Sequence, residues 1–367
     1  MKFLDLFAGI GGFRLGLEQA GHECVGYVEI DKFARKSYEA IHDTKGEWTA
    51  NDITKVTDNE WRELRGTVDI ITGGFPCQSF SIAGKRRGFE DTRGTLFFDI
   101  ARAAEQIKPR YLFLENVRGL LSHDKGQTFA TILTALHELG YDAEWCICNS
   151  KNYGVAQNRE RVFIVGHLRG AGTRKIFSLP RNDATFNNKR IKKIGNIRKR
   201  GRSQSGDVVS IDGLAPTLCS TTTQKDPVKI IQRPRGNNKG GEHEIAPTVT
   251  SNSYHENNLL KITEATLKGY TEASPGDSVN VSHPGSKTRR GRVGKQIANT
   301  LLTGEEQAVV TEEFDLRRIT PRECWRLQGF PDWAFDKAQA VNSDSQLYKQ
   351  AGNSVTVPVI EAISRNF

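Results

Sequence analysis

The chain has 367 residues, a length that suits two domains, and its 37% hydrophobic and 26% charged residues are ordinary for a globular protein. No apolar run reaches the length of a membrane span, which excludes a helical membrane protein and predicts no membrane partner. The net charge of +9 is concentrated in residues 168–310, where 24 Lys and Arg stand against 12 Asp and Glu. Such a one-sided charge favours a polyanionic partner, most often nucleic acid, over a merely soluble basic surface.

The chain begins with a strand, a glycine turn and a helix. Residues 2–7 predict a strand, 8–12 contain three glycines, and 13–20 predict an amphipathic helix. This order is typical of the start of a nucleotide-binding α/β sheet, in which the glycines let a ligand approach the helix N-terminus. The spacing is not G-x-G-x-x-G, which disfavours a dinucleotide, and the turn alone could be only a tight connection.

Acidic residues follow the next two strands. The strand predicted at 24–31 ends in Glu29 and Asp31, and 51–54 marks a third strand end with Asp52. A carboxylate after the second strand commonly holds a ribose hydroxyl pair, and Asp52 is placed to meet a base or an amino group. Glu29 and Asp31 could instead be a solvated strand end or a helix cap.

Cys77 follows a predicted buried strand at 68–72, the position where ligands bind in open α/β sheets. Its neighbours are polar or flexible, and the loop at 79–93 is rich in glycine and charged residues. A thiol beside positive charge has a stabilised thiolate, which is the nucleophilic form. The sequence therefore favours a reactive cysteine with a lid-like loop over a buried structural thiol.

An acid and two arginines complete the candidate site. Glu115 follows a strand and is expected at the same sheet edge as Cys77, either as a buried acid with a raised pKa or as a structural carboxylate paired with a basic group. Arg159 and Arg161 are expected on one side of the chain, either gripping a ligand or forming a surface ion-pair ladder. Strands and helices alternate up to this point, which predicts a Rossmann-like, mostly parallel α/β sheet with helices on both faces.

Segment 168–310 has a different character. It has no Trp, and it carries three copies of one short pattern at 214–218, 245–249 and 297–301, each followed by apolar residues. The repeats predict a small β-rich domain of three hairpin-like units rather than a floppy basic linker. We therefore expect a catalytic domain at 1–167, a second domain at 168–310 and a C-terminal segment at 311–367.

The C-terminal segment is predicted to be helical. The sequence predicts a helix that stops at Gly329. Its start is marked by Thr320 as N-cap, Pro321 at the first helical position and Glu323 at the third. A short helix is expected at 346–350, a polar turn at 351–355 and a last helix at 357–363.

The six cysteines do not have the spacing of a disulfide framework or of a zinc site. Cys146 and Cys148 are expected on opposite faces of one strand, where they could not bind one metal. These features predict no metal and a reducing cytoplasm as the compartment.

Six separated motifs, taken together and in order, resemble the DNA (cytosine-5) methyltransferases of bacterial restriction–modification systems. They are Asp5–Gly12, Gly74–Gln78, Glu115–Val117, Gln157–Arg161, Arg317–Pro331 and Gly352–Val355. Segment 168–310 occupies the place of the family's target-recognition domain, which varies among members.

The resemblance implies S-adenosylmethionine as cofactor and duplex DNA as substrate, with the target cytosine flipped out of the duplex. By motif position, the cofactor pocket would be lined by Phe7, Gly9, Ile10, Gly11, Glu29, Asp52, Ile53, Pro76, Leu96, Asn353 and Val355.

The resemblance also implies roles for the catalytic residues. The Cys77 thiolate would add to C6 of the cytosine, and Glu115 would hydrogen-bond N3 and the exocyclic amine. Arg161 would bind O2, and Arg159 would help position the thiolate or the backbone. The DNA phosphates would be met by the loop residues Lys85, Arg86 and Arg87. The base that removes the C5 proton is not assigned.

The expected setting is a monomer that protects host DNA beside a restriction endonuclease acting on the same site. The alternatives are an RNA methyltransferase with the same motifs, a catalytically silent DNA-binding protein and a dehydrogenase. The long basic segment favours duplex DNA over RNA. A catalytically silent protein is disfavoured because all four candidate catalytic residues are present, namely Cys77, Glu115, Arg159 and Arg161. The glycine spacing argues against a dehydrogenase.

Overall fold

The computed structural model describes residues 1–76, 96–177, 193–196, 207–209, 229–232, 241–243, 258–282, 286, 288–304, 306–312 and 315–367. Cys77, the loop at 79–93 with Lys85, Arg86 and Arg87, and the repeats at 214–218 and 245–249 lie outside these residues.

The chain divides into two compact units. The larger unit consists of Met1–Arg181, Ile297–Gln307 and Ile319–Phe367, and the smaller unit consists of Asn182–Gln296 and Ala308–Arg318. These bounds differ from the expected ones, because 168–181 and 297–307 join the larger unit and 311–318 joins the smaller one.

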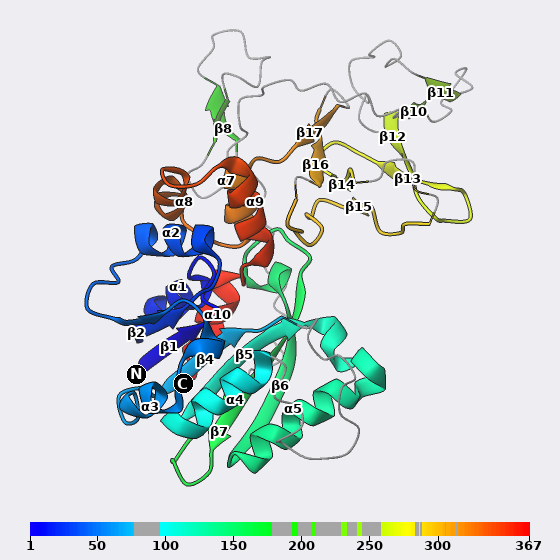
Figure 1. Cartoon of the computed structure of the whole chain (residues 1–367). Coiled ribbons are helices and arrows are strands. Elements are labelled where there is room, and N and C mark those ends of the chain that lie inside the picture. Colours follow the sequence, from blue (N-terminus) through cyan, green and yellow to red (C-terminus); the bar gives the residue numbers. More distant parts are fainter. Residues whose placement is uncertain are drawn as a thin grey trace. The chain divides into compact units, whose positions relative to one another are not determined.

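The larger unit is built on a seven-stranded sheet with the order β3-β2-β1-β4-β5-β7-β6 (Figure 1). The strands are β1 (Lys2–Leu6), β2 (Glu23–Val28), β3 (Trp48–Ala50), β4 (Ile70–Gly74), β5 (Tyr111–Val117), β6 (Tyr141–Asn149) and β7 (Glu160–Leu168). Strands β1 to β5 pair in parallel, whereas β7 is antiparallel to both β5 and β6. The prediction of a mostly parallel sheet is confirmed.

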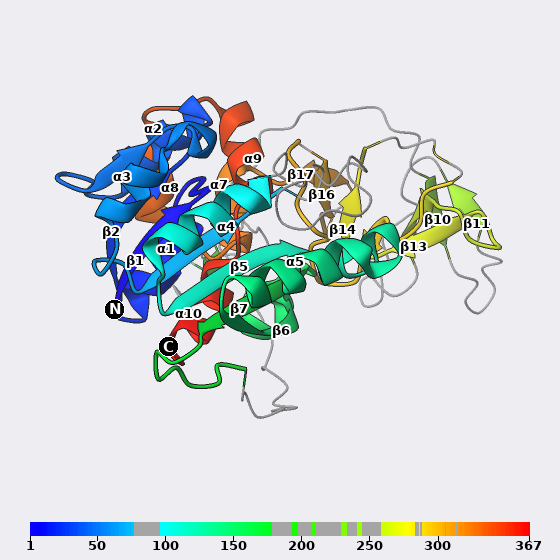
Figure 2. The same ribbon diagram turned by 60° about the horizontal axis from the view of Figure 1, so that its bottom comes forward.

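Helices cover both faces of this sheet because side chains along each strand alternate between the two faces. On one face, Leu4 and Leu114 pack with α3 (Asp58–Glu63), α4 (Leu96–Ile107) and α5 (Gln127–Glu138). On the other face, Phe3 and Phe113 pack with α1 (Gly12–Gln19) and α10 (Val357–Ser364). Figure 2 shows α4 and α5 along one side of the sheet. The Rossmann-like α/β class is confirmed.

The C-terminal helices return to the N-terminal part of the sheet. Helices α7 (Pro321–Leu327), α8 (Asp332–Gln339) and α9 (Asp344–Asn353) form an apolar core with α1 and α2 (Lys32–Ile41). A Cβ atom on Gly16 of α1 would lie 2.6 Å from Ile360 Cβ, so α1 and α10 pack closely only because this residue is glycine. The predicted capping box of α7 is confirmed, since Thr320 and Glu323 bond each other's backbone N–H groups.

The smaller unit is β-rich, as predicted. One antiparallel sheet contains β10 (Lys229–Gln232), β11 (Gly241–His243), β12 (Asn258–Thr263) and β13 (Tyr270–Ala273). A second sheet contains β14 (Ser278–Asn280), β15 (Val293–Gly294), β16 (Gln307–Val310) and β17 (Leu316–Arg318), and β8 (Lys193–Asn196) pairs with β9 (Asp207–Val209). The apolar residues that follow each repeat lie in β10, β12 and β16.

Three local predictions are wrong. The turn expected at 351–355 is helical through Asn353, because α9 continues to that residue. The third repeat, 297–301, pairs with residues 156–158 through Ala298 rather than forming a hairpin-like unit. Cys146 and Cys148 lie on the same face of β6, with 3.3 Å between their Sγ atoms, because residues two apart on a strand share a face.

No helix within the described ranges is both long and apolar enough to cross a membrane. Over the same ranges, no group of three or more His, Cys, Asp or Glu residues could hold a metal ion.

Candidate active site

A cavity of about 420 Å³ opens at the carboxyl end of the parallel strands in the larger unit. It lies where open α/β sheets bind their ligands. The residues that line it come from the ends of β1, β2, β4 and β5, from the start of β7 and from α9. They include Phe7, Gly9, Ile10, Glu29, Asp31, Pro76, Glu115, Asn116, Arg159, Arg161, Lys349 and Asn353.

At one end of the cavity, the glycine turn is fixed to Glu29. The Gly9 N–H donates to Glu29 Oε2 and the Asp31 N–H donates to Oε1, each at 2.7 Å. Gly11 caps α1 with φ of 84°, a left-handed conformation that favours glycine. Burial raises the pKa of Glu29, and the hydrogen bonds from Asp31 and Gly9 partly oppose that rise. The site thus presents a fixed carboxylate beside an open turn.

Asp31 takes the capping role that the sequence left open. Its side chain accepts hydrogen bonds from the backbone N–H groups of Phe33 and Ala34 at the start of α2. Its other oxygen lies 2.7 Å from Nζ of Lys349 on α9. Glu29 is therefore the carboxylate that faces the glycine turn, and Asp31 connects α2 to α9.

Only part of the expected cofactor set lines this cavity. Phe7, Gly9, Ile10, Glu29, Pro76 and Asn353 do. The cavity lining found among the described residues does not include Gly11, Asp52, Ile53, Leu96 or Val355. Asp52 instead accepts hydrogen bonds from the N–H and hydroxyl of Thr54, and Val355 packs in the core against α1 and α10.

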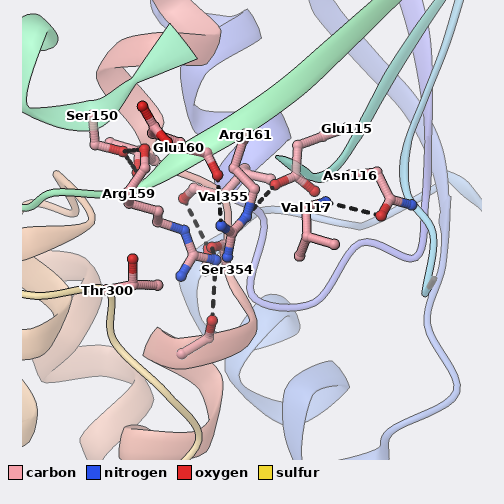
Figure 3. Close-up of polar contacts among 12 residues, drawn as sticks. Glu115, Asn116, Val117, Ser150, Arg159, Glu160, Arg161, Thr300, Ser354 and Val355 are labelled. Carbon is pink, nitrogen blue, oxygen red and sulfur yellow. Dashed lines mark hydrogen bonds and ion pairs between the residues drawn. The ribbon is translucent and has the colours of Figure 1, made fainter. Parts of the chain in front are cut away.

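At the other end of the cavity, Glu115 is paired with Arg161 (Figure 3). Arg161 Nε lies 2.9 Å from Glu115 Oε1. The contact is an ion pair rather than a well-aligned hydrogen bond, and Oε1 accepts no hydrogen bond from any residue the structure describes. Burial raises the pKa of Glu115, whereas the Arg161 and Arg159 cations lower it. Both expected roles of Glu115, a buried acid and an ion-pair partner, are thus compatible with its surroundings.

Arg159 is almost fully buried and does not belong to a surface ladder. Its guanidinium donates to the carbonyl oxygens of Gly352 at 3.1 Å and Ser354 at 2.8 Å, at the end of α9. A third, longer bond of 3.4 Å reaches the carbonyl of Leu301. Burial lowers the pKa of Arg159 to about 9, so it remains a cation at neutral pH. Arg159 therefore fixes the backbone on both sides of Asn353, which lines the cavity.

Asn116 is a positioning residue whose role the sequence did not reveal. Its side-chain N–H₂ donates to the carbonyl of Phe75 at 2.8 Å, and its Oδ1 accepts from the Val117 N–H. Phe75 precedes Pro76 and Cys77, so this buried amide fixes the backbone that leads to the cysteine. The only sequence signal was its place directly after Glu115 at a strand end.

Replacing Gly352 by alanine is expected to destabilise the larger unit by about 1–3 kcal/mol, because overpacking forces backbone shifts. A Cβ atom there would lie 2.2 Å from the Leu302 carbonyl oxygen, and that backbone atom cannot rotate away. Urea unfolding measures the effect. Gly119→Ala is the control, since its Cβ would meet nothing nearer than 4.0 Å. Equal stability of the two variants would contradict the packing of α9 described here.

Comparisons with known proteins identify the family of the chain. The family model described as C-5 cytosine-specific DNA methylase matches residues 1–367. The chain is 37% identical to the type II methyltransferase M.HpaII of Haemophilus parainfluenzae, over 99% of this chain and 88% of that protein. It is 32% identical to the type II methyltransferase M.HhaI of Haemophilus parahaemolyticus, over 100% and 94% of the two chains. The Dnmt2 methyltransferase structure from S. pombe shares the fold, with a TM-score of 0.53 and 17% identity over 99% and 96%.

Proposed function

Since this chain belongs to the C-5 cytosine-specific DNA methylase family and is a DNA cytosine-5 methyltransferase, we propose that it methylates C5 of a flipped-out cytosine in duplex DNA. The methyl donor is S-adenosylmethionine, and the target lies in one short sequence. The observation that carries the proposal is the single cavity that joins the glycine turn and Glu29 to Glu115 and Arg161. Two ligands bound at its two ends can meet.

The residues at the glycine turn fit S-adenosylmethionine. A Cβ atom on Gly9 would meet nothing within 4 Å, so the turn leaves room for a ligand at the start of α1. Glu29 is held by two backbone N–H groups and can accept hydrogen bonds from ribose hydroxyls. Asn353 lines the same cavity, and Arg159 fixes the backbone around it. When bound, S-adenosylmethionine supplies an electrophilic methyl group.

The remaining residues act on the cytosine. The Cys77 thiolate adds to C6 and forms a C–S bond, which makes C5 nucleophilic enough to accept the methyl group. Loss of the C5 proton to a base then restores the double bond as Cys77 leaves. The target cytosine must be turned out of the duplex, because its C5 and C6 atoms are stacked between neighbouring base pairs.

Glu115 and Arg161 stabilise the cytosine during addition. The raised pKa of Glu115 favours its protonated form, which can donate to N3 of the base as the thiolate adds. The same carboxyl group can also accept a hydrogen bond from the exocyclic amine. Arg161, held beside this carboxyl group, can donate to O2.

The rest of the chain would recognise DNA. Residues 168–310 carry the excess positive charge and would read the target sequence, while Lys85, Arg86 and Arg87 in the loop at 79–93 would bind phosphates. The names of the type II relatives support host protection beside a restriction endonuclease. We propose a cytoplasmic enzyme that acts as a monomer, because one active site suffices for each strand of the target.

Bisulfite sequencing tests the proposal directly. Mixed-sequence duplex DNA is incubated with the protein and S-adenosylmethionine, and a reaction without cofactor is the control. Cytosines protected in one short context would establish the reaction and the recognition sequence together. Absence of protection, with cofactor binding demonstrated by calorimetry, would contradict the DNA substrate and favour RNA.

Exchanging residues 182–296, which belong to the smaller unit, for the equivalent segment of a relative is expected to transfer that relative's sequence specificity while methyl transfer continues. The reason is that the proposed catalytic residues all lie outside this segment. Bisulfite sequencing of the chimera measures its target. A chimera that still methylates the original site would show that target recognition lies elsewhere.

A further inference from the structure

Two thiols face each other on β6, outside the residues that line the cavity. Cys146 and Cys148 point to the same side of the strand, and their Sγ atoms are 3.3 Å apart. Cys148 is buried, whereas Cys146 is partly exposed to solvent. The other free cysteines described, Cys24 and Cys324, are both buried, and burial raises the pKa of each to about 12. The pair on β6 therefore differs from these two cysteines, because its two sulfur atoms are adjacent and one of them is partly exposed to solvent.

A third group acts on the same sulfur. The Tyr153 hydroxyl donates to Cys148 Sγ at 3.2 Å. Hydrogen bonds from Cys146 and from Tyr153 stabilise the Cys148 thiolate and lower its pKa, against the effect of burial. The hydrogen bond to Cys148 and burial raise the pKa of Cys146 instead. Thiolates rather than thiols react with oxidants, so Cys148 is the sulfur of the pair that these contacts favour for reaction.

We propose that Cys146 and Cys148 form an oxidative modification site that a hydroperoxide closes to a disulfide. Two S–H bonds break and one S–S bond forms, while the hydroperoxide is reduced, hydrogen peroxide giving two molecules of water. The product is a strained disulfide, because residues two apart on a strand have Cα atoms about 6.6 Å apart, near the upper limit of about 6.8 Å for disulfides. A strained disulfide is readily reduced, so the modification is reversible by a dithiol.

The site is connected to both arginines of the proposed active site. Cys148 is the register partner of Arg161 in the β6–β7 ladder. The next residues hold Arg159, because Asn149 Oδ1 accepts from its N–H and the Ser150 N–H donates to its carbonyl. Closing the disulfide draws 146 and 148 together and bends β6 at this point. On the proposed function, an ångström-scale shift of these arginines lowers methyl transfer by up to about 10²-fold.

Peptide mapping of the full-length protein tests the site without relying on activity. Cleavage after Lys125 and Lys151 yields the tryptic peptide 126–151, in which Cys146 and Cys148 are the only cysteines. The protein is treated with hydrogen peroxide, alkylated with iodoacetamide, digested and analysed by mass spectrometry. The expected result is a peptide that has lost two hydrogens and takes no alkyl group, and that regains both thiols after dithiothreitol. A peptide that stays doubly alkylated, while the peptide containing Cys77 is oxidised in the same sample, would overturn the proposal.

Cys146→Ser is the matched variant, since it removes one sulfur from the partly exposed position and leaves Cys77 unchanged. In this variant the disulfide cannot form, so any activity lost after peroxide treatment is attributed to oxidation of Cys77. The wild type is expected to lose more activity than the variant and to recover more of it with dithiothreitol. Equal loss and recovery in the two proteins, with the disulfide mapped, would overturn the link to methyl transfer only. Phenylarsine oxide, which binds paired thiols, is expected to label wild-type peptide 126–151 and not the variant. Failure to label it would overturn the proximity of the two thiols.

Discussion

Replacing Cys77 by alanine is expected to abolish methyl transfer, by about 10⁴-fold or more, because removal of a covalent nucleophile leaves only binding and electrostatic catalysis. Binding of duplex DNA is expected to stay close to wild type, since the thiol is needed for addition to C6 and not for contact with the duplex. Transfer of tritiated methyl groups measures the reaction, and a gel-shift titration measures DNA binding.

Two further variants make the Cys77 result specific. Cys77→Ser keeps the size of the side chain but offers a poor nucleophile, so its activity is expected to be as low as that of the alanine variant. Cys146→Ser removes a thiol outside the cavity lining and is expected to retain activity under reducing conditions. Wild-type activity in Cys77→Ala would refute the covalent mechanism, and equal loss in all three variants would indicate a general need for cysteine in folding.

Replacing Glu115 by glutamine is expected to lower kcat by about 10²–10⁴-fold, the range for loss of a general acid. Glutamine keeps the volume of the side chain but cannot supply and recover a proton. In the wild type, the protonated fraction of Glu115 falls as pH rises through its raised pKa, so kcat is expected to decline on the alkaline side of the profile. That decline should be absent in the variant. Steady-state kinetics at several pH values measures both effects.

The Glu115 variant also leaves Arg161 without its ion-pair partner, which is a structural change. Thermal unfolding and the affinity for S-adenosylmethionine therefore need to be measured beside kcat. Glu160→Gln is the control, because Glu160 lies on neighbouring β7 and pairs with Arg118 at a largely exposed position. A Glu115→Gln protein that is folded, binds cofactor and has wild-type kcat would contradict the proposed role.

Local patterns in the sequence were sufficient to predict the α/β sheet and several side-chain contacts. The glycine turn, the helix that follows it and the capping box at Thr320 all depend on neighbours within a few residues, so their patterns are visible in the chain itself. The pairing of Glu115 with a basic group was one of two roles that the strand end allowed, and Arg161 is that group.

Contacts between distant parts of the chain could not be predicted in this way. Arg159 bonds to carbonyls 193 and 195 residues away, and nothing in its own motif indicates them. Residues Gly352 and Asn353 have the composition of a turn, yet they are helical, and Gly352 packs against the backbone of Leu302. The shared face of Cys146 and Cys148 could have been predicted from the sequence, because the period of two along a strand places both residues on one face.

The long-range bonds of Arg159 also bear on when the protein becomes active during its synthesis. A nascent chain emerges from the ribosome with its N-terminal part first. The strands β1 to β7 are therefore made long before α9 and α10, whose residues provide the carbonyls for Arg159 and an apolar layer against α1. An unfinished chain lacks Asn353 and one wall of the cavity. We therefore expect that prematurely terminated chains cannot modify DNA, so that methylation by this protein depends on completed translation.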